Sequence, residues 1–151
     1  DGIRDRSPSR GLGDVYKRQI LRISIGAMLI HHGYEKTADI QNFADAFVRP
    51  IGLPFPILSS YIAAYSEIYG SWLVIVGLFT RFAALSIVGT IGVAIYHAIV
   101  TAGFNIYLLE LLILYMGGSL CILLLGSGDF AIDRFLRKFR IKFNKPHLPF
   151  E

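Results

Sequence analysis

The sequence has 151 residues, of which 54% are hydrophobic, and its mean hydropathy of +0.53 is high for a soluble globular protein. Its single cysteine, Cys121, excludes an internal disulfide and a CxxC redox pair. The formal net charge is +4, but the basic residues gather towards the two ends of the chain, so the charge indicates a membrane orientation rather than nucleic-acid binding.

Residues 1–19, DGIRDRSPSRGLGDVYKRQ, are polar, aperiodic and rich in arginine. Asp14–Gln19 resembles one reading frame of the end sequence used in transposon-based DNA sequencing libraries, and Asp1–Asp5 and Ser9–Gly13 resemble neighbouring parts of the same adapter. We therefore interpret residues 1–19 as a translated adapter that is disordered and lies outside the fold. On this interpretation the native start of the protein is missing.

The first predicted membrane span covers residues 20–34, ILRISIGAMLIHHGY. It is short, because a bilayer crossing takes about 20 mostly apolar residues, and the missing start is expected to supply its first turns. The polar stretch 35–56 follows. Its spacing of apolar residues predicts a short amphipathic helix that lies at the outer membrane surface and ends near Pro50.

The second predicted span, residues 57–79, carries one charge near its middle, Glu67. A charged group at bilayer depth costs roughly 2.5–3.5 kcal/mol, so a retained one faces a partner or a cavity. Small residues share the Glu67 side of the helix and would let another helix approach closely, whereas three tyrosines lie on the other side. Glu67 is therefore predicted to point into a bundle. The small residues are Ser60, Ala63, Ala64, Gly70 and Ser71, and the tyrosines are Tyr61, Tyr65 and Tyr69.

The third and fourth predicted spans cover residues 82–102 and 106–125, and tight turns precede both. The third span has a small and polar side that carries His97 and is expected to face inward, and an aliphatic side that is expected to face lipid. The fourth span carries Glu110 one turn from its start. The inward side holds Ser86, Gly89, Thr90, Ala94 and Thr101, and the lipid side holds Leu85, Val88, Ile91, Ile95 and Ile99.

Residues 129–151 are predicted to form a basic amphipathic tail at the cytoplasmic membrane surface. By the positive-inside rule, four spans then place both termini in the cytoplasm and the segments 35–56 and 103–105 outside. Lipid is the expected partner of the tail, and no nucleic acid is expected. The candidate membrane-surface contacts are Arg134, Arg137, Lys138, Arg140 and Lys142.

The predicted fold is thus all-α: an integral membrane antiparallel four-helix bundle over residues 20–128, with a short outer-loop helix and an amphipathic basic C-terminal tail. In this arrangement four ionisable residues, one on each helix, fall in the outer half. Such a cluster can pass protons or hold a polar head group, although each member also has a purely structural interpretation as an interfacial or hydrogen-bonded residue. No HxxH or ExxH spacing supports a metal site, and none is predicted. The four residues are His32, Glu67, His97 and Glu110.

Several short motifs follow one another between Ile20 and Leu136. They are His32-Gly33 with Lys36, Gly52-Leu53-Pro54, Glu67 with Gly70, Gly77-Leu78-Phe79-Thr80-Arg81, His97, and Gly126–Asp129 at the end of the fourth span. In their order and spacing they resemble the DoxX family of small bacterial four-helix membrane proteins. One departure is Ser71, where that family often has a second glycine.

The resemblance implies a bacterial inner-membrane protein. Some relatives look like membrane subunits of thiosulfate:quinone oxidoreductases, and others resemble partners in membrane complexes that handle oxidative or thiol stress. The first hypothesis is accordingly a subunit of a quinone-linked redox system, with no covalently bound cofactor and a pocket formed by Glu67, His97 and His32. The alternatives are a non-catalytic membrane anchor for a soluble oxidoreductase and a small-solute transporter. The oligomeric state is not predicted.

Overall fold

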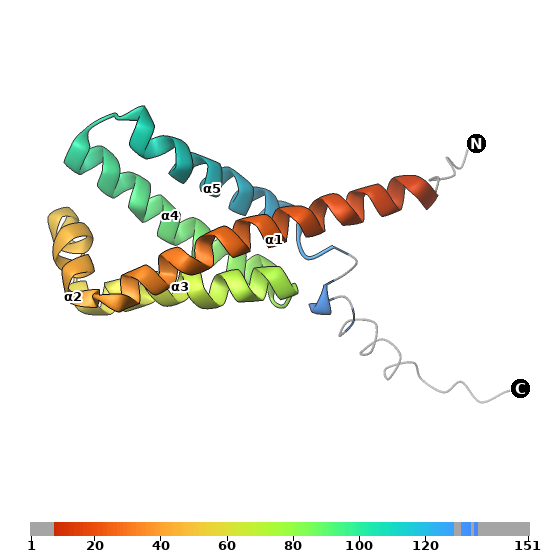
Figure 1. The fold of residues 1–151 in the computed structure, drawn as a ribbon, viewed down its shortest axis with the longest axis horizontal. Helices are drawn as coiled ribbons and strands as arrows, with labels where there is room; N and C mark the ends of the chain where they lie inside the picture. The colour runs from red at the N-terminus through yellow and green to blue at the C-terminus, as the bar shows by residue number, and fades with distance from the viewer. Residues whose placement is uncertain (1–7, 129–130, 134, 136–151) are drawn as a thin grey trace, which may run out of the picture.

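The computed structural model describes residues 8–128, 131–133 and 135, and this part of the chain is all-helical, without strands (Figure 1). The predicted all-α class is thereby confirmed. Four long helices alternate with short connections, and three short helical turns stand between the first two of them. In chain order the elements are α1 (Pro8–Ala38), α2 (Ile40–Phe43), the π-helical turn η1 (Ala44–Val48), the 3₁₀ turn η2 (Arg49–Ile51), α3 (Pro56–Val76), α4 (Thr80–Ala102) and α5 (Ile106–Leu125).

Helix α1 begins well before the predicted first span. Residues 8–19 belong to it, so the structure differs from the prediction of a disordered segment there. No proline interrupts the chain between Pro8 and Ala38, and good helix formers such as Lys17 and Arg18 lead into the apolar part. Arg18 Nη1 also donates a hydrogen bond to the Leu125 carbonyl oxygen at 2.8 Å. The proposed adapter origin of these residues stays a prediction.

The turn between α3 and α4 lies three residues earlier than predicted. Helix α3 ends at Val76 because Gly77 takes a left-handed conformation with φ 78° and its N–H bonds to the Leu73 carbonyl oxygen at 2.8 Å. Phe79 follows with φ 46°, and α4 begins at Thr80 instead of residue 82. Helix α5 has the predicted bounds, and the Asn105 side chain accepts a hydrogen bond from the Tyr107 N–H at 3.0 Å, which caps its first turn.

Helix α1 packs closely along α3. A Cβ at Gly26 would lie 2.5 Å from Ile75 Cγ1, and one at Gly33 would lie 2.6 Å from Ile68 Cγ1. Glycine is therefore needed at both positions for the two backbones to approach this far. The prediction that the small side of the second span receives another helix, and that Glu67 points inward with it, is confirmed. The buried residues of that side are Ser60, Ala64, Glu67, Gly70 and Ser71, whereas Tyr61, Tyr65 and Tyr69 are exposed and stack on one another.

Helix α4 lies between α3 and α5 and contacts both. Its aliphatic side was expected to face lipid, but Ile91 is buried and belongs to the core together with Ile87, Ile122 and Tyr115. The expectation fails there because a helix with neighbours on two sides buries two faces. In Figure 1 the α4–α5 pair meets the α1–α3 pair where α1 passes α5. The two pairs diverge from each other towards the end where α2 lies.

Two helices of the described chain, α4 and α5, are long and apolar enough to cross a membrane. A third candidate arises if the residues Ile40–Ile51 and helix α3, which meet at a bend of 107°, are counted as one broken span. Helix α3, which contains serines, tyrosines and Glu67, is not such a candidate by itself. The sequence predicted four spans, and the finer prediction of an antiparallel four-helix bundle stays a prediction.

Candidate functional site

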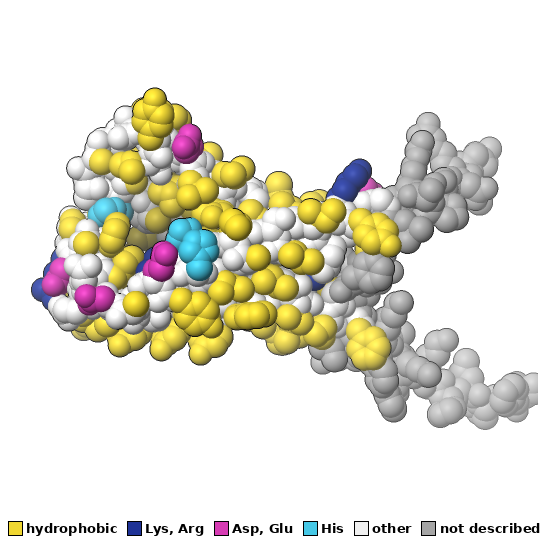
Figure 2. All heavy atoms as spheres, in the orientation of Figure 1, with side chains coloured by type: hydrophobic (Ala, Val, Ile, Leu, Met, Phe, Trp, Pro, Cys, Tyr) yellow, Lys and Arg dark blue, Asp and Glu magenta, His cyan; other side chains and the backbone are white. Residues whose placement is uncertain are grey.

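A cavity of about 930 Å³ lies where the two helix pairs diverge. Residues of α1, α3, α4 and α5 line it, and the turns α2 and η1 contribute Phe43 and Phe47. Figure 2 shows the hollow between the pairs, with histidine, basic and acidic side chains around it and hydrophobic side chains within. The volume falls in the range of roughly 300–1,000 Å³ that is common for small-molecule sites in proteins. The cavity can therefore hold a mostly apolar ligand of moderate size.

A buried ion pair forms part of the cavity wall. Glu67 on α3 has only 2% of its side chain exposed, and its Oε2 contacts Nζ of Lys36, whose side chain is 17% exposed. The same ammonium group lies 5.5 Å from the centre of the Phe43 ring. Because α1 and α3 approach closely at Gly33, the last turns of α1 bring Lys36 to the depth of Glu67.

Two further polar groups face the cavity from α3 and α4. The hydroxyl oxygens of Ser66 and Thr90 lie 2.5 Å apart and join the two helices by a hydrogen bond. His97 Nε2 lies 3.3 Å from the Ala46 carbonyl oxygen, and its ring centre is 5.1 Å from that of Phe47. His97 thus connects α4 to the turn η1, which lies across the diverging end of the helices.

The structure brings three of the four predicted pocket residues to one cavity. His32, Glu67 and His97 all line it, whereas Glu110 is exposed on α5 and is not among its lining residues. The inward side predicted for the third span also lines it, with Ser86, Gly89, Thr90, Ala94 and Thr101. The predicted membrane-surface residues of the tail, Arg134, Arg137, Lys138, Arg140 and Lys142, lie outside the described residues.

Sequence reasoning missed the role of Lys36, although it stands in one of the motifs quoted above. It lies three residues after Gly33 and so shares a helix face with it. The sequence did contain a signal for this role. Lys36 lies one turn beyond Gly33, and a glycine lets its helix approach another helix closely, here the one that carries Glu67. The prediction stopped the first span at residue 34 and therefore assigned Lys36 to a loop.

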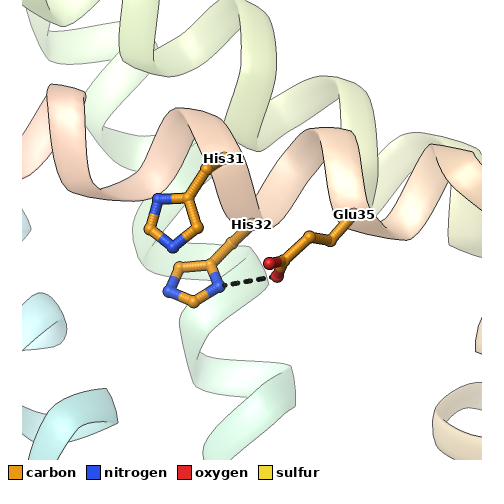
Figure 3. Close-up of side chains that lie close together, drawn as sticks. All are labelled: His31, His32 and Glu35. Carbon is orange, nitrogen blue, oxygen red and sulfur yellow. Dashed lines mark hydrogen bonds and ion pairs between the residues drawn. The ribbon is translucent and has the colours of Figure 1, made fainter.

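A second group of polar side chains lies on α1 beside the cavity. His31, His32 and Glu35 project from one face of the helix, with the two imidazole rings next to each other and the carboxylate turned back towards them (Figure 3). The ring centres of the histidines are 4.0 Å apart, and His32 Nδ1 lies 3.3 Å from Glu35 Oε2. These three side chains could hold a metal ion, which the HxxH and ExxH patterns could not reveal because the histidines are adjacent.

The opposite end of the molecule is held by Arg22, which is buried in α1 and was also missed. Its Nε and Nη2 donate to the carbonyl oxygens of Val74 and Ile75 at 2.9 and 3.0 Å, and its Nη1 donates to the Ser127 carbonyl oxygen. These acceptors belong to the last turn of α3 and to the segment after α5, which lack helical partners. A lone arginine within an apolar run was the available signal.

These features define a helical membrane protein whose helix pairs pack together at one end and diverge at the other. The diverging end contains a ligand-sized cavity with a buried ion pair in its wall. A family model described as DoxX matches residues 18–102, more than half of the chain, and the chain belongs to the DoxX family. A protein of Haemophilus influenzae (strain ATCC 51907 / DSM 11121 / KW20 / Rd), described as uncharacterized, is similar to it, with 30% identity over 136 residues that cover 85% of this chain and 89% of that protein. No solved structure matches the chain.

Proposed function

We propose that this DoxX-type membrane protein is a multi-pass inner-membrane subunit of a quinone-linked redox system, and that the cavity binds the quinone. The observation that carries the proposal is an apolar cavity of about 930 Å³ whose wall contains the buried Lys36–Glu67 pair. The apolar walls suit the ring and the first part of an isoprenoid tail. In the membrane the chain would form four spans with both termini in the cytoplasm.

The polar groups of the cavity suit the two carbonyl oxygens of a quinone. Lys36 can donate a hydrogen bond from its ammonium group, and His97 can donate one from its imidazole. Glu67 can take up or release a proton next to Lys36, and Ser66 and Thr90 can relay hydrogen bonds from the facing wall. The chain's own residues would thus orient the ring and supply or accept protons.

Reduction of a quinone to a quinol takes two electrons and two protons. The chain has one cysteine, Cys121, which cannot form a redox-active pair within the chain. We therefore assign the electrons to a partner oxidoreductase that oxidises thiosulfate or a thiol, and we assign the binding and proton-transfer steps to this subunit.

The test is a calorimetric titration of the full chain, in mild detergent, with a short-tail ubiquinone analogue. We expect saturable binding that is at least about tenfold weaker in Glu67→Gln, which corresponds to about 1.4 kcal/mol. Glu110→Gln removes an exposed carboxylate outside the cavity and is the matched control, with unchanged binding expected.

Folding of each variant is checked by its thermal unfolding midpoint. Thr90→Leu fills the cavity from the facing wall without touching the ion pair, and we expect it to reduce binding as well. Absence of saturable binding in the folded wild-type chain, or equal losses in Glu67→Gln and Glu110→Gln, would contradict the proposal. The anchoring alternative would then be tested by deleting residues 134–145.

A further inference from the structure

We propose that His31, His32 and Glu35 form a binding site for a divalent transition-metal ion, with Zn²⁺ or Fe²⁺ as the best-suited ions. The three side chains lie together on α1 (Figure 3), and His32 and Glu35 also line the cavity. This inference does not rest on the quinone proposal, because the cluster can bind an ion whether or not the cavity holds a quinone.

The geometry of the three side chains carries the inference. One ligand atom from each residue lies within 4.8 Å of the ligand atoms of the other two. Two donors bound to one Zn²⁺ at about 2.0–2.1 Å in tetrahedral geometry are roughly 3.4 Å apart. Rotamer adjustments of about an ångström therefore close the cluster around an ion, and α1 itself does not have to move.

The spacing in the helix explains why the three side chains converge. Glu35 lies four residues after His31 and three after His32, so its carboxylate reaches back over one turn to both rings. The centres of the two imidazole rings lie 4.0 Å apart, so both rings stand on the same side of α1 (Figure 3). Adjacent histidines followed by a carboxylate one turn later thus act as a single-helix chelate.

The donor chemistry selects the class of ion. Two imidazoles and one carboxylate suit Zn²⁺ and Fe²⁺, whereas Ca²⁺ and Mg²⁺ prefer sites made of oxygen. The charge also fits, because Lys36, the basic residue next to Glu35 in the sequence, turns inward and pairs with Glu67. Among the described residues, the Glu35 carboxylate contacts His32, which is itself a proposed ligand.

The position of the cluster allows an ion to enter and to keep an open coordination position. His31 and Glu35 are exposed, and His32 is half-buried. His32 and Glu35 also line the cavity, so a water molecule or an oxygen atom of a cavity ligand can complete the coordination. Three protein ligands with one free position are typical of metal sites that bind a further molecule.

The test uses the untagged full chain in mild detergent, stripped of metal with a chelator and then titrated with Zn²⁺ against a chromophoric competitor. We expect one equivalent to bind with a Kd below about 10 µM, and binding at least about tenfold weaker in His31→Asn, His32→Asn and Glu35→Gln. His97→Asn, which changes a histidine on α4 that also lines the cavity, is the matched control and should leave the Kd unchanged.

A second readout is the thermal unfolding midpoint, which Zn²⁺ should raise in the wild-type chain and in His97→Asn but not in the three ligand variants. Glu35→Asp, which keeps the charge but shortens the reach, should bind with intermediate affinity. Zinc binding that is unchanged in the three ligand variants, or lost equally in His97→Asn, would overturn the inference. A folded wild-type chain that binds no zinc would overturn it as well, without affecting the quinone titration.

Discussion

Lys36 places a positive charge against the buried carboxylate of Glu67. The inward position of one of these two residues could be predicted from the sequence, and that of the other could not. The inward direction of Glu67 followed from the small residues on its side of the helix, a local pattern that a sequence displays. The position of Lys36 could not be obtained in this way, because it depends on how far α1 extends and on the close approach of α1 to α3 at Gly33.

At the same scale, we predict that Lys36→Met lowers the free energy of unfolding by about 3–5 kcal/mol, because it leaves the Glu67 carboxylate buried without a partner. The double variant Lys36→Met/Glu67→Leu should regain most of that stability, since an apolar pair needs no counter-charge. SDS-induced unfolding in mixed micelles measures both. A single variant as stable as the wild-type chain would show that the ion pair is not formed.

At the scale of the helices, the bounds of α5 and the end of α4 were predicted correctly, because Asn105, Gly103 and Gly126 mark them in the sequence. The divergence of the two helix pairs was not predicted. The divergence depends on the positions at which glycines let two helices approach closely. The periodicity of one helix shows which side is buried, but not where that helix crosses its neighbour. The extension of α1 to Pro8 was missed because residues 8–19 carry no apolar stripe.

We predict at this scale that Gly33→Ala destabilises the protein by about 1–3 kcal/mol, because the added Cβ would lie 2.6 Å from Ile68 Cγ1 and 2.9 Å from the Ala64 carbonyl oxygen. Gly117→Ala is the matched control, since a Cβ there meets nothing within 4 Å and should stabilise its helix by up to about 1 kcal/mol. Thermal unfolding in detergent compares the two. Equal midpoints would mean that α1 and α3 are not in close contact at Gly33.

At the scale of the whole molecule, the orientation in the membrane is the prediction still to be tested. In a Cys121→Ser background, we expect Phe104→Cys in the α4–α5 turn to react with a membrane-impermeant maleimide in intact cells. Ser127→Cys, at the opposite end of α5, should react only after the cells are permeabilised. Phe104 is 81% exposed, so its reactivity reports the side of the membrane and not burial. The reverse pattern would place both termini outside.

Arg22 and Asp133 join the last part of the described chain to helix α1 and to the start of α4. Arg22 reaches Ser127, 105 residues further on, and Asp133 reaches back 54 residues to accept a hydrogen bond from the Phe79 N–H at 2.8 Å, next to the first turn of α4. During synthesis, the guanidinium group and the start of α4 therefore lack these partners until residues 127–133 leave the ribosome. A chain that stalls earlier has the Arg22 guanidinium group bound only to the Val74 and Ile75 carbonyl oxygens and has no Asp133 beside the start of α4, so the packing of this end is completed late in translation.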